Sequence, residues 1–422
     1  MGRIAETSLL RHRDFLKLWW GQAVSELGSG ITMLALPLVA ITALHATAFQ
    51  VGALNAAQMA PFLLFGLPAG TIVDWLRRRQ VMVVADVGRM LALGSLPLTA
   101  AFGSLTFAQL YLVAFVAGTL TVLFDVAYQS YLPVLVPRAQ LADGNSKLAA
   151  TQQLAGITGS ALGGALVTAV GAATAIAADA ASYLLSVLSL VWIRGSEARP
   201  SREQEVSRLR ALRRDTAEGL RYVVRQPSLR MIAACTGSSN LAASMVEAVI
   251  VLFMVRELHL SAAAIGAIFA AGGIAGVIAA LVAGRLLRAG GVGPVTVGCA
   301  FLFAGAGVLL PLASEGVGAV WVIAGLAVAS FGGIVYNIGQ LSYRQAITPD
   351  RLLGRMNATM RFMVWGTLPI GALIGGALGD YVGLRPTLWI SAALGLISPL
   401  FLLASPLREV RVLPTEAELS AA

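Results

Sequence analysis

Twelve long apolar runs constrain the fold of this 422-residue sequence more than any other feature. A bilayer core about 30 Å thick needs roughly 20 mostly apolar residues for each spanning helix. The runs are continuous and do not alternate over ten-residue segments as barrel strands do, so they predict helices. We expect an all-α integral membrane protein with spans near residues 18–43, 51–73, 80–102, 106–134, 148–169, 173–193, 230–255, 262–287, 293–313, 317–341, 358–379 and 385–404.

The basic residues predict how these spans are oriented. Lys and Arg accumulate in cytoplasmic joints, so we place both termini and the basic joints on the cytoplasmic side. Nearly all of the 30 Lys and Arg residues then lie on that side, whereas Arg256 and Arg385 lie opposite and Arg89 lies within a span. The net charge of +9 is thereby explained by topology, and we expect no nucleic-acid partner.

The two halves of the chain are related by an internal repeat. At an offset of 214 residues Leu44-His45 falls on Leu258-His259, and at an offset of 212 Gly163-Gly164 falls on Gly375-Gly376. Such a repeat is typical of transporters. We expect six-helix bundles over 1–193 and 230–407, a cytoplasmic connector over 194–229 and a cytoplasmic tail over 408–422. Between Glu205 and Gln226 the connector places apolar residues on one rough helical face amid arginines, which predicts an amphipathic helix on the anionic inner leaflet, with a regulatory partner site as the alternative.

The joint between the second and third spans resembles a family signature. It runs from Gly70 through Asp74 to Arg77-Arg78-Arg79, and resembles the loop G-x-x-x-D-R-x-G-R-R of the major facilitator superfamily, with Trp75 and Arg77 departing from the pattern. A degenerate second copy spans Gly284 to Arg288. The resemblance implies the major facilitator fold and a loop that latches the outward-open state.

The resemblance also implies partners for the charged residues of this loop. Asp74 would face the start of the eleventh span, and Arg78 would pair with an acid on the fourth span, for which Asp125 is the candidate. Asp86 and Arg89 are one helical turn apart, so we expect them to neutralise each other or to join the Asp74 network. We favour a gating role for these residues over direct contact with a substrate.

A second group of motifs points to one branch of this family. Gly159-Ser160-Ala-Leu-Gly163-Gly164 resembles the antiporter motif G-P-x-x-G-G with Ser160 in place of proline, and such spacing lets helices pack closely. The sequence also resembles the drug–proton antiporter branch, which includes macrolide, tetracycline-type and enterobactin exporters. The similar segments are Trp20-Gly21-Gln22, Asp179 to Tyr183 and Glu218 to Tyr222. The resemblance implies export of a drug or siderophore.

Acidic residues inside the spans are the candidates for proton coupling. Each costs roughly 2.5–3.5 kcal/mol on insertion, so each is a functional hypothesis. Glu26 lies nine residues beyond Lys17, which places it about 13 Å along the helix and near the midplane. Burial disfavours a charged carboxylate, which suits a proton carrier, although Glu26 could instead serve packing. Further candidates are Asp125, Asp179 and Glu247.

The repeat makes the two halves chemically unequal. Under the same offsets Glu26 corresponds to Asn240 and Asp125 to Asn337, so the first half keeps carboxyls where the second has amides. We expect polar and aromatic residues to line a central cavity, and His45 and His259 to act as interfacial anchors. The cavity candidates are Gln22, Phe62, Tyr128, Gln129, Tyr183, Asn240, Asn337, Gln340 and Trp365.

Other function classes lack their residues in this sequence. No G-x-x-x-x-G-K-[ST] motif occurs, so transport driven by ATP is excluded. The three histidines and two cysteines are scattered, so we expect no enzyme, no metal and no cofactor. We predict a monomeric, proton-coupled exporter of a small amphipathic compound in the bacterial inner membrane, in contact with lipid. The alternatives are a lipid or lysophospholipid transporter and a nutrient facilitator of the same fold.

Overall fold

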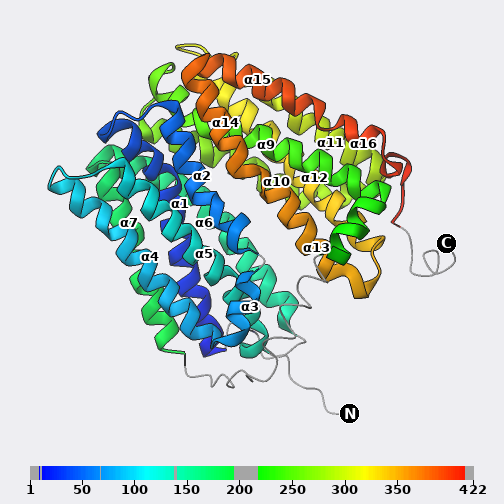
Figure 1. Ribbon diagram of the computed structural model, residues 1–422, viewed down its shortest axis with the longest axis horizontal. Helices are drawn as coiled ribbons and strands as arrows, with labels where there is room; N and C mark the ends of the chain where they lie inside the picture. The colour runs from blue at the N-terminus through cyan, green and yellow to red at the C-terminus, as the bar shows by residue number, and fades with distance from the viewer. Residues whose placement is uncertain (1–8, 10–11, 67, 137–139, 194–216, 414–422) are drawn as a thin grey trace. The chain divides into compact units, whose positions relative to one another are not determined.

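The computed structural model describes residues 9, 12–66, 68–136, 140–193 and 217–413, and these residues form helices joined by short turns (Figure 1). Twelve helices in this part of the chain are long and apolar enough to cross a membrane, which confirms the predicted all-α, twelve-span architecture. Most of the predicted connector helix lies outside the described residues, and residues 217–225 at its end are helical.

Several spans consist of more than one helical segment. The second span ends at Phe65 and a separate short helix follows it in sequence, whereas the eleventh span is divided at Gly366 and the twelfth near Pro399. The helices are α1 (Arg13–Ala43), α2 (Ala48–Phe65), α3 (Pro68–Trp75), α4 (Arg78–Ala101), α5 (Phe107–Leu135), α6 (Leu141–Val170), α7 (Ala172–Val191), α9 (Pro227–Arg256), α10 (Ala262–Gly290), α11 (Val292–Ala306), α12 (Gly318–Ala346), α13 (Asp350–Trp365), α14 (Thr367–Tyr381), α15 (Leu384–Ile397) and α16 (Leu400–Leu403), with 3₁₀ turns at Gly307–Leu309 and Pro406–Glu409.

The chain forms two compact units. One comprises Met1–Leu44 and Leu64–Arg202, and the other comprises His45–Leu63 and Glu203–Ala422. Within the first unit α7 packs along both α1 and α4, and α6 packs along α1 (Figure 1). Within the second unit α14 and α15 pack along α9, and α12 packs along α10 and α11. Most of α2 therefore belongs to the second unit, although the repeat assigns this helix to the first six spans.

The repeat is visible in the backbone at the joints after α1 and α9. His45 and His259 have φ angles of 52° and 50°, and among the described residues they are the non-glycine residues at positive φ. A side chain in this left-handed region costs roughly 1–2 kcal/mol, so the same unusual turn occurs at the same place in both repeats.

Glycines set the spacing of α1 against α6 and of α9 against α14. A Cβ built at Gly159 would lie 2.7 Å from the carbonyl oxygen of Leu27 and 2.9 Å from the Cα of Gly30, so the two backbones of α1 and α6 are in contact. Gly375 approaches Met245 of α9 in the same way, with a built Cβ 2.6 Å from its carbonyl oxygen. Helices of a membrane protein associate chiefly through such close packing.

Candidate functional site

A buried arginine lies at the centre of a charge cluster in the first unit. Arg89 of α4 is 5% exposed, and its Nη2 donates to Oδ1 of Asp86, which is fully buried. The guanidinium carbon lies 4.5 Å from the centroid of the Phe124 ring and 4.4 Å from that of Tyr183. The aromatic faces and the ion pair offset the cost of burying this charge. The structure thus places the two residues of the Asp86–Arg89 spacing in one ion pair.

Asp179 of α7 is the second fully buried acid of the cluster. Ser182 Oγ donates to its Oδ1 at 3.1 Å. The carboxyl packs directly against α1, because a Cβ built at Gly28 would overlap both Asp179 and Ser182. Among the described residues, the second carboxyl oxygens of Asp86 and Asp179 have no hydrogen-bond partner. Asp179 therefore joins α7 to α1 beside Arg89, with which it interacts electrostatically.

Glu26 of α1 is half-buried and is held by two amides. Gln22 Nε2 and Gln152 Nε2 donate to its Oε1 at 2.7 and 3.2 Å. Glu26 also interacts electrostatically with Arg89. The carboxylate is thus oriented by neutral donors while one guanidinium lies within electrostatic range.

Asp125 and Tyr128 of α5 complete the cluster. Asp125 is half-buried and interacts electrostatically with Arg89, and Tyr128 interacts with both Asp125 and Glu26. The Tyr128 ring stacks on Phe124 with centroids 5.9 Å apart. Four acids therefore surround one arginine, whereas the predicted pairing of Arg78 with Asp125 stays a prediction.

Three predicted cavity residues of the first unit lie in this cluster, and one lies apart from it. Gln22, Tyr128 and Tyr183 contact it, and the Tyr183 hydroxyl lies 2.9 Å from Ser29 Oγ. Gln129 is exposed on α5. Sequence reasoning missed Phe124, Ser29, Gln152 and Thr121, to whose Oγ1 Arg89 Nη1 donates at 3.4 Å. Phe124 lies one turn before Tyr128, and Thr121 lies one turn before Asp125. Both could have been identified from their position on the same helix face as these residues.

The residues of the signature loop lie at the ends of α3 and α4. Gly70 and Asp74 belong to α3, and nothing is described of the Asp74 side chain. Arg79 Nε and Nη2 donate to the carbonyls of Leu190 and Val191 at 2.8 and 2.5 Å. Arg79 therefore binds the C-terminus of α7, where a cation is favoured by the helix dipole. Gly284 and Arg288 lie together in the last turns of α10.

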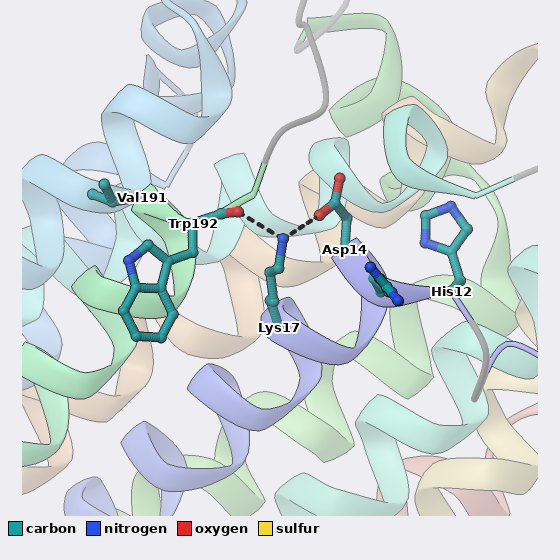
Figure 2. A pocket seen from close by; sticks show the side chains of 6 residues that line it. His12, Asp14, Lys17, Val191 and Trp192 are labelled. Carbon is teal, nitrogen blue, oxygen red and sulfur yellow. Dashed lines mark hydrogen bonds and ion pairs between the residues drawn. The ribbon is translucent and has the colours of Figure 1, made fainter.

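A cavity of about 820 Å³ lies at the same end of the first unit, between the start of α1 and the end of α7 (Figure 2). Lys17 Nζ donates to Asp14 Oδ1 and to the Trp192 carbonyl, both at 2.7 Å. The cavity is lined by His12, Arg13, Asp14, Lys17, Val191 and Trp192. None of the predicted substrate residues lines it, so this cavity is separate from the charge cluster.

The second unit holds amides where the first unit holds acids. Gln340 Nε2 donates to Asn337 Oδ1 at 2.9 Å and Arg344 Nη1 donates to Gln340 Oε1 at 3.1 Å. Arg344 Nη2 reaches Asn357 Oδ1 of α13 at 3.1 Å. Sequence reasoning missed Asn357, and it missed Arg344 because basic residues near span ends are usually topological.

The remaining predicted residues of the second unit lie apart from this amide chain. Asn240 Nδ2 donates to the Val364 carbonyl at 3.2 Å. The rings of Phe62 and Trp365 lie 5.4 Å apart, with the Arg361 guanidinium 4.3 Å from the latter. Glu247 of α9 is exposed, and its main-chain carbonyl accepts from Asn55 at 3.2 Å.

Comparison with known proteins agrees with this architecture. The model of the Major Facilitator Superfamily matches residues 18–368 and 232–421. The chain is 27% identical over 373 residues to the multidrug efflux pump Tap of Mycobacterium tuberculosis, covering 85% of each protein. It is 27% identical over 379 residues to the enterobactin exporter EntS of Citrobacter koseri, covering 88% of this chain and 87% of the exporter.

Solved structures share the fold at low sequence identity. A bacterial homologue of the iron transporter ferroportin, in an inward-facing state, matches with a TM-score of 0.74 and 18% identity over 94% of this chain and 99% of its own. The nucleoside transporter NupG matches with a TM-score of 0.71 and 12% identity over 93% of this chain and 98% of its own. Together with the family match over nearly the whole sequence, the twelve spans and the repeat, this shows that the chain belongs to the major facilitator superfamily of membrane transporters.

Proposed function

We propose that this protein is a proton-coupled antiporter that exports a small amphipathic compound by alternating access. The exporter assignment is supported by the names of its relatives, a multidrug efflux pump and an enterobactin exporter. We place it in the inner membrane as a monomer with both termini cytoplasmic, in keeping with the basic joints of the sequence.

The observation that carries the coupling proposal is the ratio of acids to arginines in the charge cluster. Glu26, Asp86, Asp125 and Asp179 all interact electrostatically with Arg89, the one arginine of this cluster in the described part of the first unit. Four ionised carboxylates would leave an excess of negative charge within the membrane, where each ionised group is costly. Protons or a bound cation remove that excess.

The surroundings of each acid suggest its role. Asp86 is bound to Arg89, and Asp179 is packed against α1, so both serve to hold the cluster together. Glu26 is half-buried and accepts only amide hydrogen bonds among those described, so it can exchange a proton without breaking an ion pair. We therefore assign proton binding to Glu26.

Antiport follows if the proton and the substrate compete for the same charge. A neutral or cationic amphipathic compound binds beside the ionised Glu26, and protonation of Glu26 removes that attraction and releases it. Arg89 does not offer a free site for an anion because Asp86 already holds it. In this scheme the loop from Gly70 to Arg79 latches the outward-facing form.

Gradient-driven transport of a lipophilic cation into inverted vesicles, whose cytoplasmic face is outside, tests this assignment. The probe is ethidium in inverted vesicles with an imposed pH gradient, and the variants are Glu26→Gln and Glu247→Gln. The second is a matched control, because Glu247 is an exposed acid of the other unit. We expect Glu26→Gln to lower the gradient-driven rate at least tenfold and to weaken ethidium binding, because the neutral amide no longer attracts the cation, and Glu247→Gln to keep more than half of the wild-type rate.

Three results would count against the proposal. Unchanged gradient-driven efflux in Glu26→Gln removes Glu26 from the coupling step. Loss of coupling in Glu247→Gln alone moves the proton site to the second unit. Ethidium efflux that ignores the pH gradient in the wild type rejects proton coupling itself.

A further inference from the structure

The first turn of α2 is bound by a carboxylate from α14. Asp380 Oδ1 accepts from the main-chain N–H of Ala48 at 2.8 Å, and Oδ2 accepts from that of Phe49 at 3.2 Å. Thr47 and Gln50 form a reciprocal capping box, with bonds of 2.9 and 3.3 Å. The amides that start this helix are thus divided between its own residues and Asp380, which lies more than 330 residues away in sequence.

The backbones of α2 and α14 approach closely beside this bond. A Cβ built at Gly376 would lie 2.8 Å from the Ala48 carbonyl oxygen and 3.0 Å from the Phe49 Cα. A Cβ built at Gly379 would lie 2.6 Å from the Cβ of Ala48. The surface of α14 is therefore shaped to receive the first two turns of α2.

The neighbouring helix α9 adds two main-chain contacts. Arg256 Nη2 donates to the Ala46 carbonyl at 2.8 Å, and Asn55 Nδ2 donates to the Glu247 carbonyl at 3.2 Å. Residues 45–63 consequently belong to the second unit, although the repeat assigns α2 to the first six spans. A contact that joins the two repeats in this way must be released when the repeats separate at this end.

We infer that Asp380 is the gating residue that holds the extracytoplasmic side closed, through its carboxylate on the N-terminus of α2. The inference rests on the proposed alternating access. An anionic group at a helix N-terminus is stabilised by the unpaired amides and by the helix dipole. The bond joins two helices and uses both carboxyl oxygens, so it stabilises the closed form. Once α2 has separated from α14, water replaces the bonds to the carboxylate and to the amides.

Distances between two spin labels test this inference in the full-length protein. The labels are placed at Phe49→Cys on α2 and Val317→Cys at the start of α12, which are 46% and 58% exposed, in a background with Cys235→Ala and Cys299→Ala. Asp380→Asn keeps the side-chain size, but its amide nitrogen cannot accept the second N–H. We expect the ratio of the long to the short distance to rise about tenfold, equivalent to about 1.4 kcal/mol.

Matched variants separate the gate from general damage to the helix end. Thr47→Ala removes the capping box of the same turn and leaves Asp380 in place, so its distances should match the wild type. Asp380→Glu should restore most of the short distance. The inference is overturned if Asp380→Asn leaves the distances unchanged, or if Thr47→Ala shifts them equally. The measurement uses no gradient and no substrate, so a failure of Glu26 in the coupling assay does not alter it.

Discussion

Arg89 and Asp86 lie one helical turn apart on α4 and form an ion pair whose side chains are 6% and 0% exposed. Such a pair is costly to break because the remaining partner keeps an uncompensated charge in a medium of low dielectric. The same pair holds Arg89 between the aromatic rings of Phe124 and Tyr183 and the other acids of the cluster. Its integrity is therefore a condition for the electrostatics of the whole site.

Removing one charge of this pair should destabilise the protein. We expect Asp86→Asn to lower the free energy of unfolding by about 3 kcal/mol, measured by thermal unfolding in detergent. The control is Asp143→Asn, since the pair of Lys147 with Asp143 is exposed and its loss should cost less than about 1 kcal/mol. Equal losses in the two variants would show that Asp86 is not energetically coupled to Arg89.

The contact between α1 and α6 should not tolerate one added methyl group. Gly159→Ala would place a Cβ 2.7 Å from the Leu27 carbonyl oxygen, and neither backbone can yield without moving a helix. We expect a loss of about 1–3 kcal/mol, seen as a lower melting temperature of the purified protein. Gly156→Ala, one turn earlier on the same helix, meets nothing within 4 Å and should be neutral or stabilising. Matching melting temperatures for the two variants would contradict the close approach.

The Tyr183 ring should matter more than its hydroxyl. Tyr183→Phe keeps the ring 4.4 Å from Arg89 and loses the hydrogen bond to Ser29, worth about 1 kcal/mol. Tyr183→Leu also loses the cation–π contact, worth about 2 kcal/mol at a desolvated site. We expect the Phe variant to keep more than half of the gradient-driven ethidium efflux and the Leu variant to lose at least fivefold. Ser29→Ala removes the same hydrogen bond from the other side and should match Tyr183→Phe, and a Leu variant as active as either would reject the role of the ring.

The end of the connector should detach from α13 if Gly219 gains a side chain. A Cβ there would lie 2.7 Å from the Arg355 carbonyl oxygen, beside the ion pair of Arg355 with Glu218 at 2.5 Å. We expect Gly219→Val to increase the rate of proteolytic cleavage in the connector several-fold. Leu220→Ala is the control, because Leu220 is 45% exposed. Cleavage at wild-type rate in Gly219→Val would show that the docking of this helix is not needed to protect the connector.

The spans and the repeat could be predicted because they depend on patterns that extend over many residues. A run of about 20 apolar residues has few alternatives to a spanning helix, and the offset of 214 places His45 on His259, where the structure shows the same left-handed turn. The spacing of Asp86 and Arg89 likewise indicates a pair within one helix. Periodic and local information was sufficient for each of these.

Contacts between distant segments could not be predicted in this way. Asp380 lies near the end of a helix, and on sequence alone it resembles a solvated acid. Its partners Ala48 and Phe49 contribute only main-chain amides, which nearly every residue has and which a sequence therefore cannot single out. Phe124 and Ser29 resemble ordinary packing residues of a membrane helix. Their roles beside Arg89 and Tyr183 depend on the arrangement of α1, α4, α5 and α7 around one point.

The left-handed turn at His45 leaves very little slack between α1 and α2. Four residues separate Ala43 from Ala48, and the five Cα–Cα steps between these two residues can span no more than about 18 Å. The joint therefore acts as a mechanical linkage: α1 carries Glu26, and the start of α2 is held by Asp380. In the proposed mechanism, a tilt of α1 that follows protonation of Glu26 would act on the start of α2, and so on its bond to Asp380, through the chain itself and without a continuous path of side chains.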